Sequence, residues 1–132
     1  MSQSSTFTGA DAAAAKAYIA TANAVVRLKT STEELEAHLE HCNEFAVGHA
    51  YAAFIMSLAG NADHAARRAG IARRSRASAT RRERQLIEIL LLSVDGDRRR
   101  AAALATEHVR EFADDAVALT VVDRWFQQRD AP

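Results

Sequence analysis

Two glycines, Gly60 and Gly96, lie 36 residues apart in the same local context. Each closes a mostly apolar segment and is followed by a segment in which small residues recur at helical spacing. Glycine readily adopts the positive φ that ends a helix, so both positions predict a sharp turn between two helices. A helix–turn–helix unit that recurs with a period of about 20–50 residues is typical of a stacked helical repeat.

The composition also favours helices over strands. The 132 residues include one proline, five glycines and 6% aromatic residues, with few of the β-branched runs from which strands form. Helical periodicity, with capping boxes that start at Ser31 and Thr80, predicts seven helices. They cover residues 11–28, a segment starting at residue 31, and residues 44–59, 62–74, 80–95, 98–112 and 114–128. We expect Asp114 to cap the last helix and Gly70 to mark a close approach between two helices.

The short connections predict antiparallel helix hairpins stacked into an all-α superhelix. This single domain is expected to span residues 11–132, after a polar, disordered segment at residues 1–10. The single cysteine, Cys42, and the lack of a signal-peptide pattern predict a reducing, cytoplasmic location. No uninterrupted apolar stretch approaches the ~20 residues that cross a bilayer, so a membrane is not an expected partner.

The stretch GDRRRAAALATEHVREFADDAVAL, residues 96–119, is similar to the second half of one tetratricopeptide repeat and the start of the next. More closely, FAVGHAYAAFIMSLAGNADHAARRAGIARR and ATRRERQLIEILLLSVDGDRRRAAAL resemble the amino-terminal repeats of the tetratricopeptide repeat protein 38-like family. The resemblance covers residues 11–126 and implies a protein-binding superhelix, with no catalytic residues to carry over. The chain departs from the pattern at His108, where a small residue is usual, and at Ala113, where proline is common.

Three potential metal ligands, Glu34, His38 and His41, are spaced at i, i+4 and i+7. One helix face could present them to a divalent metal. The alternative is the solvated side of a helix that buries Leu35 and Leu39, and the His-Glu-x-x-His pattern of zinc proteases is absent. We favour the solvated side, and expect no metal and no cofactor.

Arginines are concentrated in the middle of the chain. Residues 67–100 carry eleven arginines and four acids, whereas residues 1–66 carry seven acids and three bases, and the net charge is zero. Such a cluster is consistent with an ion-paired solvated surface, an acidic protein partner or nucleic acid. The zero net charge and the lack of interleaved aromatics argue against nucleic acid. The arginine cluster comprises Arg67, Arg68, Arg73, Arg74, Arg76, Arg81, Arg82, Arg84, Arg98, Arg99 and Arg100.

The last predicted helix carries two apolar rows, and a terminal repeat normally turns a polar face to water. We therefore predict an interface, with a second copy of this chain, with the first helix or with a partner protein; the alternative is a well-buried terminal helix. The predicted interface residues are Ala118, Val121, Trp125 and Phe126.

The first helices of stacked hairpins usually line a concave groove. The candidates for groove or packing positions are His49, Tyr51, Met56, Gln85 and Glu88. No nucleophile elbow, phosphate loop or paired-carboxylate motif occurs, so the chain is not expected to be an enzyme. The sequence thus predicts a scaffold that binds a protein or peptide, with its last helix as a candidate surface for homo-oligomer formation. The alternative is a nucleic-acid-associated protein that acts through the arginine cluster.

Overall fold

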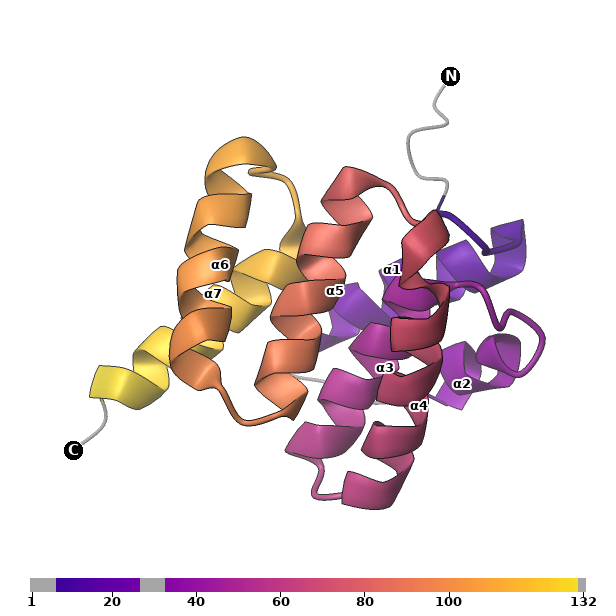
Figure 1. Ribbon diagram of the computed structural model, residues 1–132, viewed down its shortest axis with the longest axis horizontal. Helices are drawn as coiled ribbons and strands as arrows, with labels where there is room; N and C mark the ends of the chain where they lie inside the picture. The colour runs from indigo at the N-terminus through magenta and orange to yellow at the C-terminus, as the bar shows by residue number, and fades with distance from the viewer. Residues whose placement is uncertain (1–6, 27–32, 131–132) are drawn as a thin grey trace.

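The structure is a computed structural model that describes residues 7–26 and 33–130, with side chains described at residues 7–19 and 35–123. Within these ranges the chain is all α-helical, so the predicted class is confirmed (Figure 1). The helices are α1 (Ala12–Val26), α2 (Glu33–Leu39), α3 (Ala46–Leu58), α4 (Ala62–Ser75), α5 (Arg81–Val94), α6 (Arg98–Glu111) and α7 (Ala116–Asp130), with a 3-10 turn, η2 (Arg76–Ser78), after α4. None of the described helices is both long and apolar enough to cross a bilayer.

The two spaced glycines end α3 and α5 as predicted, with φ of +85° at Gly60 and +88° at Gly96. At both turns the amide two residues beyond the cap donates back across the end of the helix, from Asn61 to the Met56 carbonyl and from Asp97 to the Leu92 carbonyl. This hydrogen bond and the one that the glycine's own N–H donates together form a Schellman motif. Asn61 and Asp97 then cap α4 and α6 with their side chains, so one dipeptide ends a helix and starts the next.

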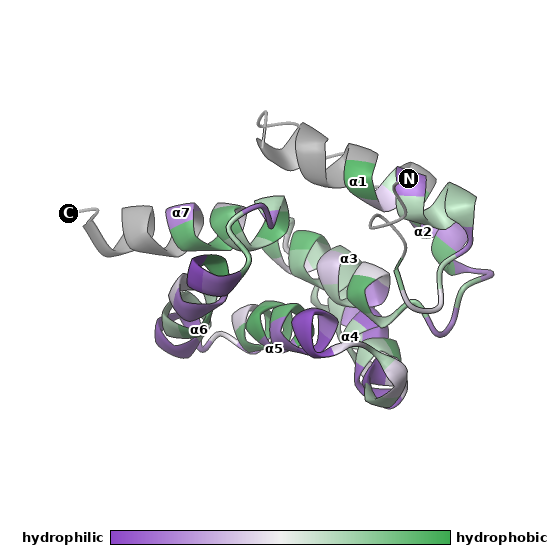
Figure 2. Ribbon diagram, turned by 90° about the horizontal axis from the view of Figure 1, so that it is seen from above, coloured by the Kyte–Doolittle hydropathy of each residue, from purple (hydrophilic) through white to green (hydrophobic). Residues whose placement is uncertain are grey.

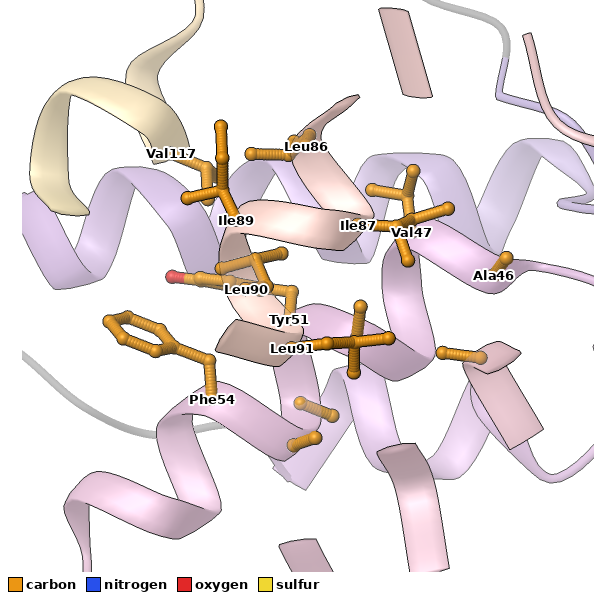
Figure 3. Packing of buried hydrophobic residues seen from close by; sticks show 14 of the residues in the cluster. Ala46, Val47, Tyr51, Phe54, Leu86, Ile87, Ile89, Leu90, Leu91 and Val117 are labelled. Carbon is orange, nitrogen blue, oxygen red and sulfur yellow. The ribbon is translucent and has the colours of Figure 1, made fainter. Parts of the chain in front are cut away.

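The helices lie in layers around α3. The α4, α5 and α6 helices line one side of the molecule, α1 and α7 lie on the opposite side, and α3 is between them (Figure 2). All the side chains of α3 from Ala46 to Ile55 are buried. Figure 3 shows the centre of the core, where Tyr51 and Phe54 of α3 lie close to Leu90 of α5. The α3–α5 contact is therefore the centre of a core to which all seven described helices contribute.

Small residues bring the second helix of each hairpin close to the first. Ala69 and Ala72 of α4 and Ala101 and Ala105 of α6 are buried, as their helical spacing predicts. The close approach predicted at Gly70 is wrong, because a Cβ there would meet only the end of the Arg74 side chain, at 3.5 Å. The buried close approaches of α4 are instead made by its alanines.

The two ends of the array meet. α1 contacts α7 as well as α2, so the first and last helices close on each other instead of ending an open superhelix. Residues 1–6 lie outside the described residues, but the disorder predicted for residues 7–10 is wrong. The Phe7 ring packs 4.9 Å from the Tyr18 ring, and the Thr8 amide donates to Glu83 at 2.9 Å.

Candidate protein-binding site

The three candidate metal ligands do not share one helix face. α2 ends at Leu39, so His41 lies beyond the helix and the i+7 spacing has no helical meaning there. His38 is half-buried, His41 is exposed, and the Glu34 side chain lies outside the described residues. Among the described residues, no three His, Cys, Asp or Glu side chains gather in a way that could hold a metal ion.

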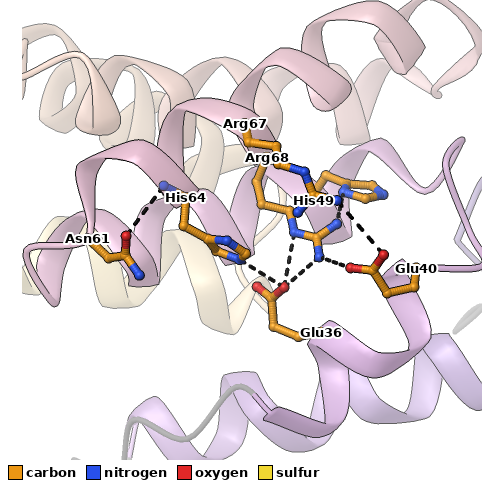
Figure 4. Close-up of polar contacts among 7 residues, drawn as sticks. All are labelled: Glu36, Glu40, His49, Asn61, His64, Arg67 and Arg68. Atoms are coloured by element: carbon orange, nitrogen blue, oxygen red, sulfur yellow. Dashed lines mark hydrogen bonds and ion pairs between the residues drawn. The ribbon is translucent and has the colours of Figure 1, made fainter.

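Arg68 does not belong to an exposed arginine cluster as predicted, because only 1% of the Arg68 side chain is exposed. Its Nη2 donates to Glu36 Oε1 at 2.6 Å and to Glu40 Oε2 at 2.7 Å (Figure 4). His64 also reaches Glu36 Oε1, at 3.0 Å. These contacts tie α4 to α2, so Arg68 is an internal tie and not part of a binding surface.

His49, a predicted groove residue, completes this buried network. Its Nδ1 lies 3.2 Å from Arg68 Nη1, and because a guanidinium can only donate, Nδ1 accepts. The ring proton is then on Nε2, which donates to the Cys42 carbonyl at 3.0 Å. Burial lowers the pKa of His49 to about 4, against the opposing effect of the Cys42 carbonyl. Of the two roles predicted for His49, the structure shows the packing role, because the ring faces inward and is neutral.

Most of the remaining arginine cluster is paired with carboxylates. The Arg81–Glu111 pair joins α5 to α6, and the Arg82 guanidinium lies 4.8 Å from the centre of the Phe112 ring. Further ion pairs are Arg67–Glu40 at 3.8 Å, Arg73–Asp95 at 3.1 Å, Arg76–Glu88 at 3.6 Å, Arg82–Asp114 at 3.0 Å and Arg100–Asp97 at 3.6 Å. Arg84 donates to the Ala79 carbonyl, and Arg74, Arg98 and Arg99 are exposed. The cluster is thus a surface of alternating charge, not one uniform positive field.

Two of the four predicted interface residues on α7 face the chain itself, which agrees with the predicted contact with the first helix and not with a free surface for a second copy or a partner. Ala118 and Val121 are fully buried, because α7 turns this row toward its neighbours α1, α5 and α6. In the other apolar row, Leu119 is 45% exposed, whereas Val122 is half-buried against the core. Trp125 and Phe126 lie on α7, but their side chains lie outside the described residues.

A second buried network joins α5, α6 and α7. His108 Nε2 lies 2.8 Å from Asp115 Oδ2, and its Nδ1 lies 2.8 Å from Gln85 Oε1. Asp115 also accepts the Ala118 amide through Oδ1, so Asp115, and not the predicted Asp114, caps α7. Gln85, a predicted groove residue, therefore also links two helices.

A cleft of about 400 Å³ opens beside this network, between α5 and α6. Each helix contributes a row of side chains at i, i+3, i+4 and i+7, so the cleft follows the hairpin. The α5–α6 cleft is lined by Arg81, Arg84, Gln85, Glu88 and Ile89 from α5, and by Leu104, Glu107, His108 and Glu111 from α6. Of the five predicted groove residues, this cleft unites only Gln85 and Glu88.

The other groove candidates lie elsewhere. Tyr51 is buried with its ring 5.3 Å from the Tyr18 ring of α1, and Met56 is half-buried against the core. The sequence did not single out His108 and Leu104 as partners in a cleft; their spacing at i and i+4 on α6 was the available signal. This spacing predicts a cleft only once the residues of α5 that face Leu104 and His108 are known.

No protein-family model, curated protein or solved structure matches this chain. The resemblance to the tetratricopeptide repeat protein 38-like family therefore stays a prediction, and the surfaces must be judged by their own chemistry.

Proposed function

We propose that this chain is a non-catalytic protein-interaction module of the tetratricopeptide-like type, which binds a peptide segment of a partner protein in the α5–α6 cleft. The observation that carries the proposal is the cleft itself, an open channel along one hairpin. Its volume of about 400 Å³ is large enough for a few side chains of a partner.

The chemistry of the lining suggests the kind of segment. Leu104 offers an apolar contact in the cleft, and carboxylates and guanidinium groups of opposite charge surround it. A peptide with one apolar anchor flanked by charged residues of both signs fits this pattern, since the anchor buries apolar area and the charges select the register.

The lining also argues against catalysis in the cleft. It contains no serine, threonine or cysteine, so it offers none of the commonest nucleophiles. Its histidine, His108, has both ring nitrogens engaged by Gln85 and Asp115, which leaves neither nitrogen free to take a substrate proton.

The test is affinity capture from nuclease-treated lysate of the native host, with Leu104→Glu compared with Ala103→Glu. Ala103 is an exposed neighbour on α6 that does not line the cleft, so both variants add the same charge to the same helix. We expect Leu104→Glu to lose a defined set of retained proteins and Ala103→Glu to keep it. Glu107→Arg, an exposed change in the cleft wall, should act like Leu104→Glu without disturbing the core.

Two results would contradict this proposal. Equal retention by the cleft variants and by Ala103→Glu would remove the cleft as the binding face. Retention from untreated lysate that is absent from the nuclease-treated lysate, or that falls steeply with salt, would favour nucleic acid bound by the arginine cluster, because phosphate contacts release counterions.

A further inference from the structure

The charged groups that line the α5–α6 cleft do not cancel one another. The lining carries three glutamates against two arginines, which leaves one glutamate in excess. At one end of the cleft, Arg81 Nη2 donates to Glu111 Oε1 at 2.8 Å, and this hydrogen bonding lowers the pKa of Glu111. Arg84 is turned toward the start of its own helix, where its Nη1 donates to the Ala79 carbonyl at 2.9 Å. Both arginines therefore serve contacts within the chain.

The carboxylate left over is that of Glu107, which is exposed on α6. Among the residues with described side chains, it has no hydrogen-bond or ion-pair partner, and not even Arg110 at i+3 lies within ion-pair distance. Glu88 of α5, which lines the same cleft, is held only loosely. Its Oε1 lies 3.6 Å from Arg76 Nη1, and both side chains are about half exposed, at 46% and 47%. A cation that enters this part of the cleft meets one unpaired and one weakly paired carboxylate.

An apolar side chain lies one turn away from the unpaired carboxylate. Leu104, at i−3 from Glu107, lines the cleft and is partly buried against the core. On a helix, side chains three residues apart lie on one face with their Cβ atoms about 5–6 Å apart. In an extended peptide, side chains two residues apart point to the same side and are separated by about 6.6 Å. A peptide residue that contacts Leu104 therefore brings the residue two positions away beside Glu107.

We propose that the α5–α6 cleft selects an extended segment with a basic residue two positions from an apolar anchor, the anchor on Leu104 and the basic head group beside Glu107 and Glu88. The inference rests on the proposed function, because it names the residue type that the same cleft recognises. Lysine and arginine suit this position, since their long stems lie along apolar surface while the charged head stays in water. An acidic residue there would face two like charges, so the cleft also rejects the wrong segment.

The test is a titration of the isotope-labelled full chain with two short peptides, followed in the amide spectrum. In both peptides a leucine has a charged residue two positions to either side, with serines elsewhere, so that either chain direction is covered. The charged residues are arginines in one peptide and glutamates in the other. We expect the arginine peptide to shift the amide signals of the cleft lining, and the glutamate peptide to bind at least about fivefold more weakly.

Charge variants test the pairing itself. Glu107→Gln should weaken binding of the arginine peptide about threefold, which is typical of the loss of one exposed ion pair. Asp123→Asn removes the same charge from an exposed position of α7 that does not line the cleft, so it should leave the affinity unchanged. Glu107→Arg should reverse the preference and make the glutamate peptide the tighter ligand.

The outcomes separate this inference from the proposed function. Equal affinity of the two peptides, a tighter glutamate peptide, or an unchanged preference in Glu107→Arg would overturn the basic residue and leave the cleft as the binding face. The same holds if neither peptide binds while Leu104→Glu still loses its retained proteins. Signal shifts confined to residues outside the cleft would place the arginines on other carboxylates and also overturn it. If neither peptide binds and Leu104→Glu keeps every retained protein, both proposals fail.

Discussion

Two buried histidines, His49 and His108, stand at the centres of two polar networks with opposite partners. His49 faces a buried cation, Arg68, and a backbone carbonyl, and its network joins α2, α3 and α4. His108 faces the Asp115 carboxylate and the Gln85 amide group, and its network joins α5, α6 and α7. Each half of the molecule thus has its own polar tie inside an otherwise apolar core.

The difference shows how neighbouring charge sets the role of a buried imidazole. Beside Arg68, the His49 ring must offer a lone pair, so it is held neutral. Beside Asp115, the Nε2 of His108 meets an acceptor, so this nitrogen donates. The first network therefore depends on a buried cation, Arg68, whose charge is balanced by two glutamates. The second depends on Asp115, which caps α7 and is oriented by His108.

The largest expected effect is at Arg68. Arg68→Ala leaves the Glu36 carboxylate and the His49 Nδ1 without their main donor, and breaking a buried ion pair costs about 3 kcal/mol or more of unfolding free energy. Arg67→Ala is the matched control, because Arg67 is exposed and 3.8 Å from Glu40, so its loss should cost under about 0.5 kcal/mol. Urea unfolding followed by circular dichroism measures both. Similar losses at the two positions would contradict the burial of Arg68.

The next effect is on pH dependence and comes from His49. With a folded pKa of about 4 and an ordinary value near 6.5, the unfolded chain binds a proton below about pH 6.5 that the folded chain does not. The unfolding free energy should therefore fall by about 2 kcal/mol between about pH 6.5 and pH 4 through this group alone.

His49→Gln isolates that contribution. Glutamine does not titrate, so the stability gap between the wild type and His49→Gln should narrow as the pH falls from 6.5 toward 4. Parallel unfolding series at several pH values check this. A gap that stays constant would show that His49 is not held neutral in the folded chain.

The sequence predicted those features that depend on a few neighbouring residues. The turns at Gly60 and Gly96 and the capping box of Thr80 are of this kind, because the donor, the acceptor and the unusual φ all lie within a few positions. The all-α class follows from the same local signals summed along the chain.

The features that the sequence did not predict depend on distant partners or on the rotation of a helix. Helical spacing puts Arg68, and not Arg67, on the buried alanine face of α4, but nothing local shows what balances its charge, since the carboxylates that surround Arg68 are 28 and 32 residues away. The two apolar rows of α7 look alike in sequence, and only the positions of α1, α5 and α6 decide which row is buried. Residues 7–10 follow a polar run and carry no helical pattern, and Phe7 with Gly9 was the hint of a docked segment.

The smallest effect tests the His108 network and separates two adjacent aspartates. Asp115→Ala removes the acceptor of the Ala118 amide and of His108 Nε2, so it should cost about 1–2 kcal/mol of unfolding free energy. Asp114→Ala removes only an exposed pair with Arg82 and should cost under about 0.5 kcal/mol. Thermal unfolding of the two variants compares them directly. If Asp114→Ala lowers the unfolding free energy more than Asp115→Ala does, Asp114 and not Asp115 is the cap of α7. Asp115 would then not link His108 to the start of α7.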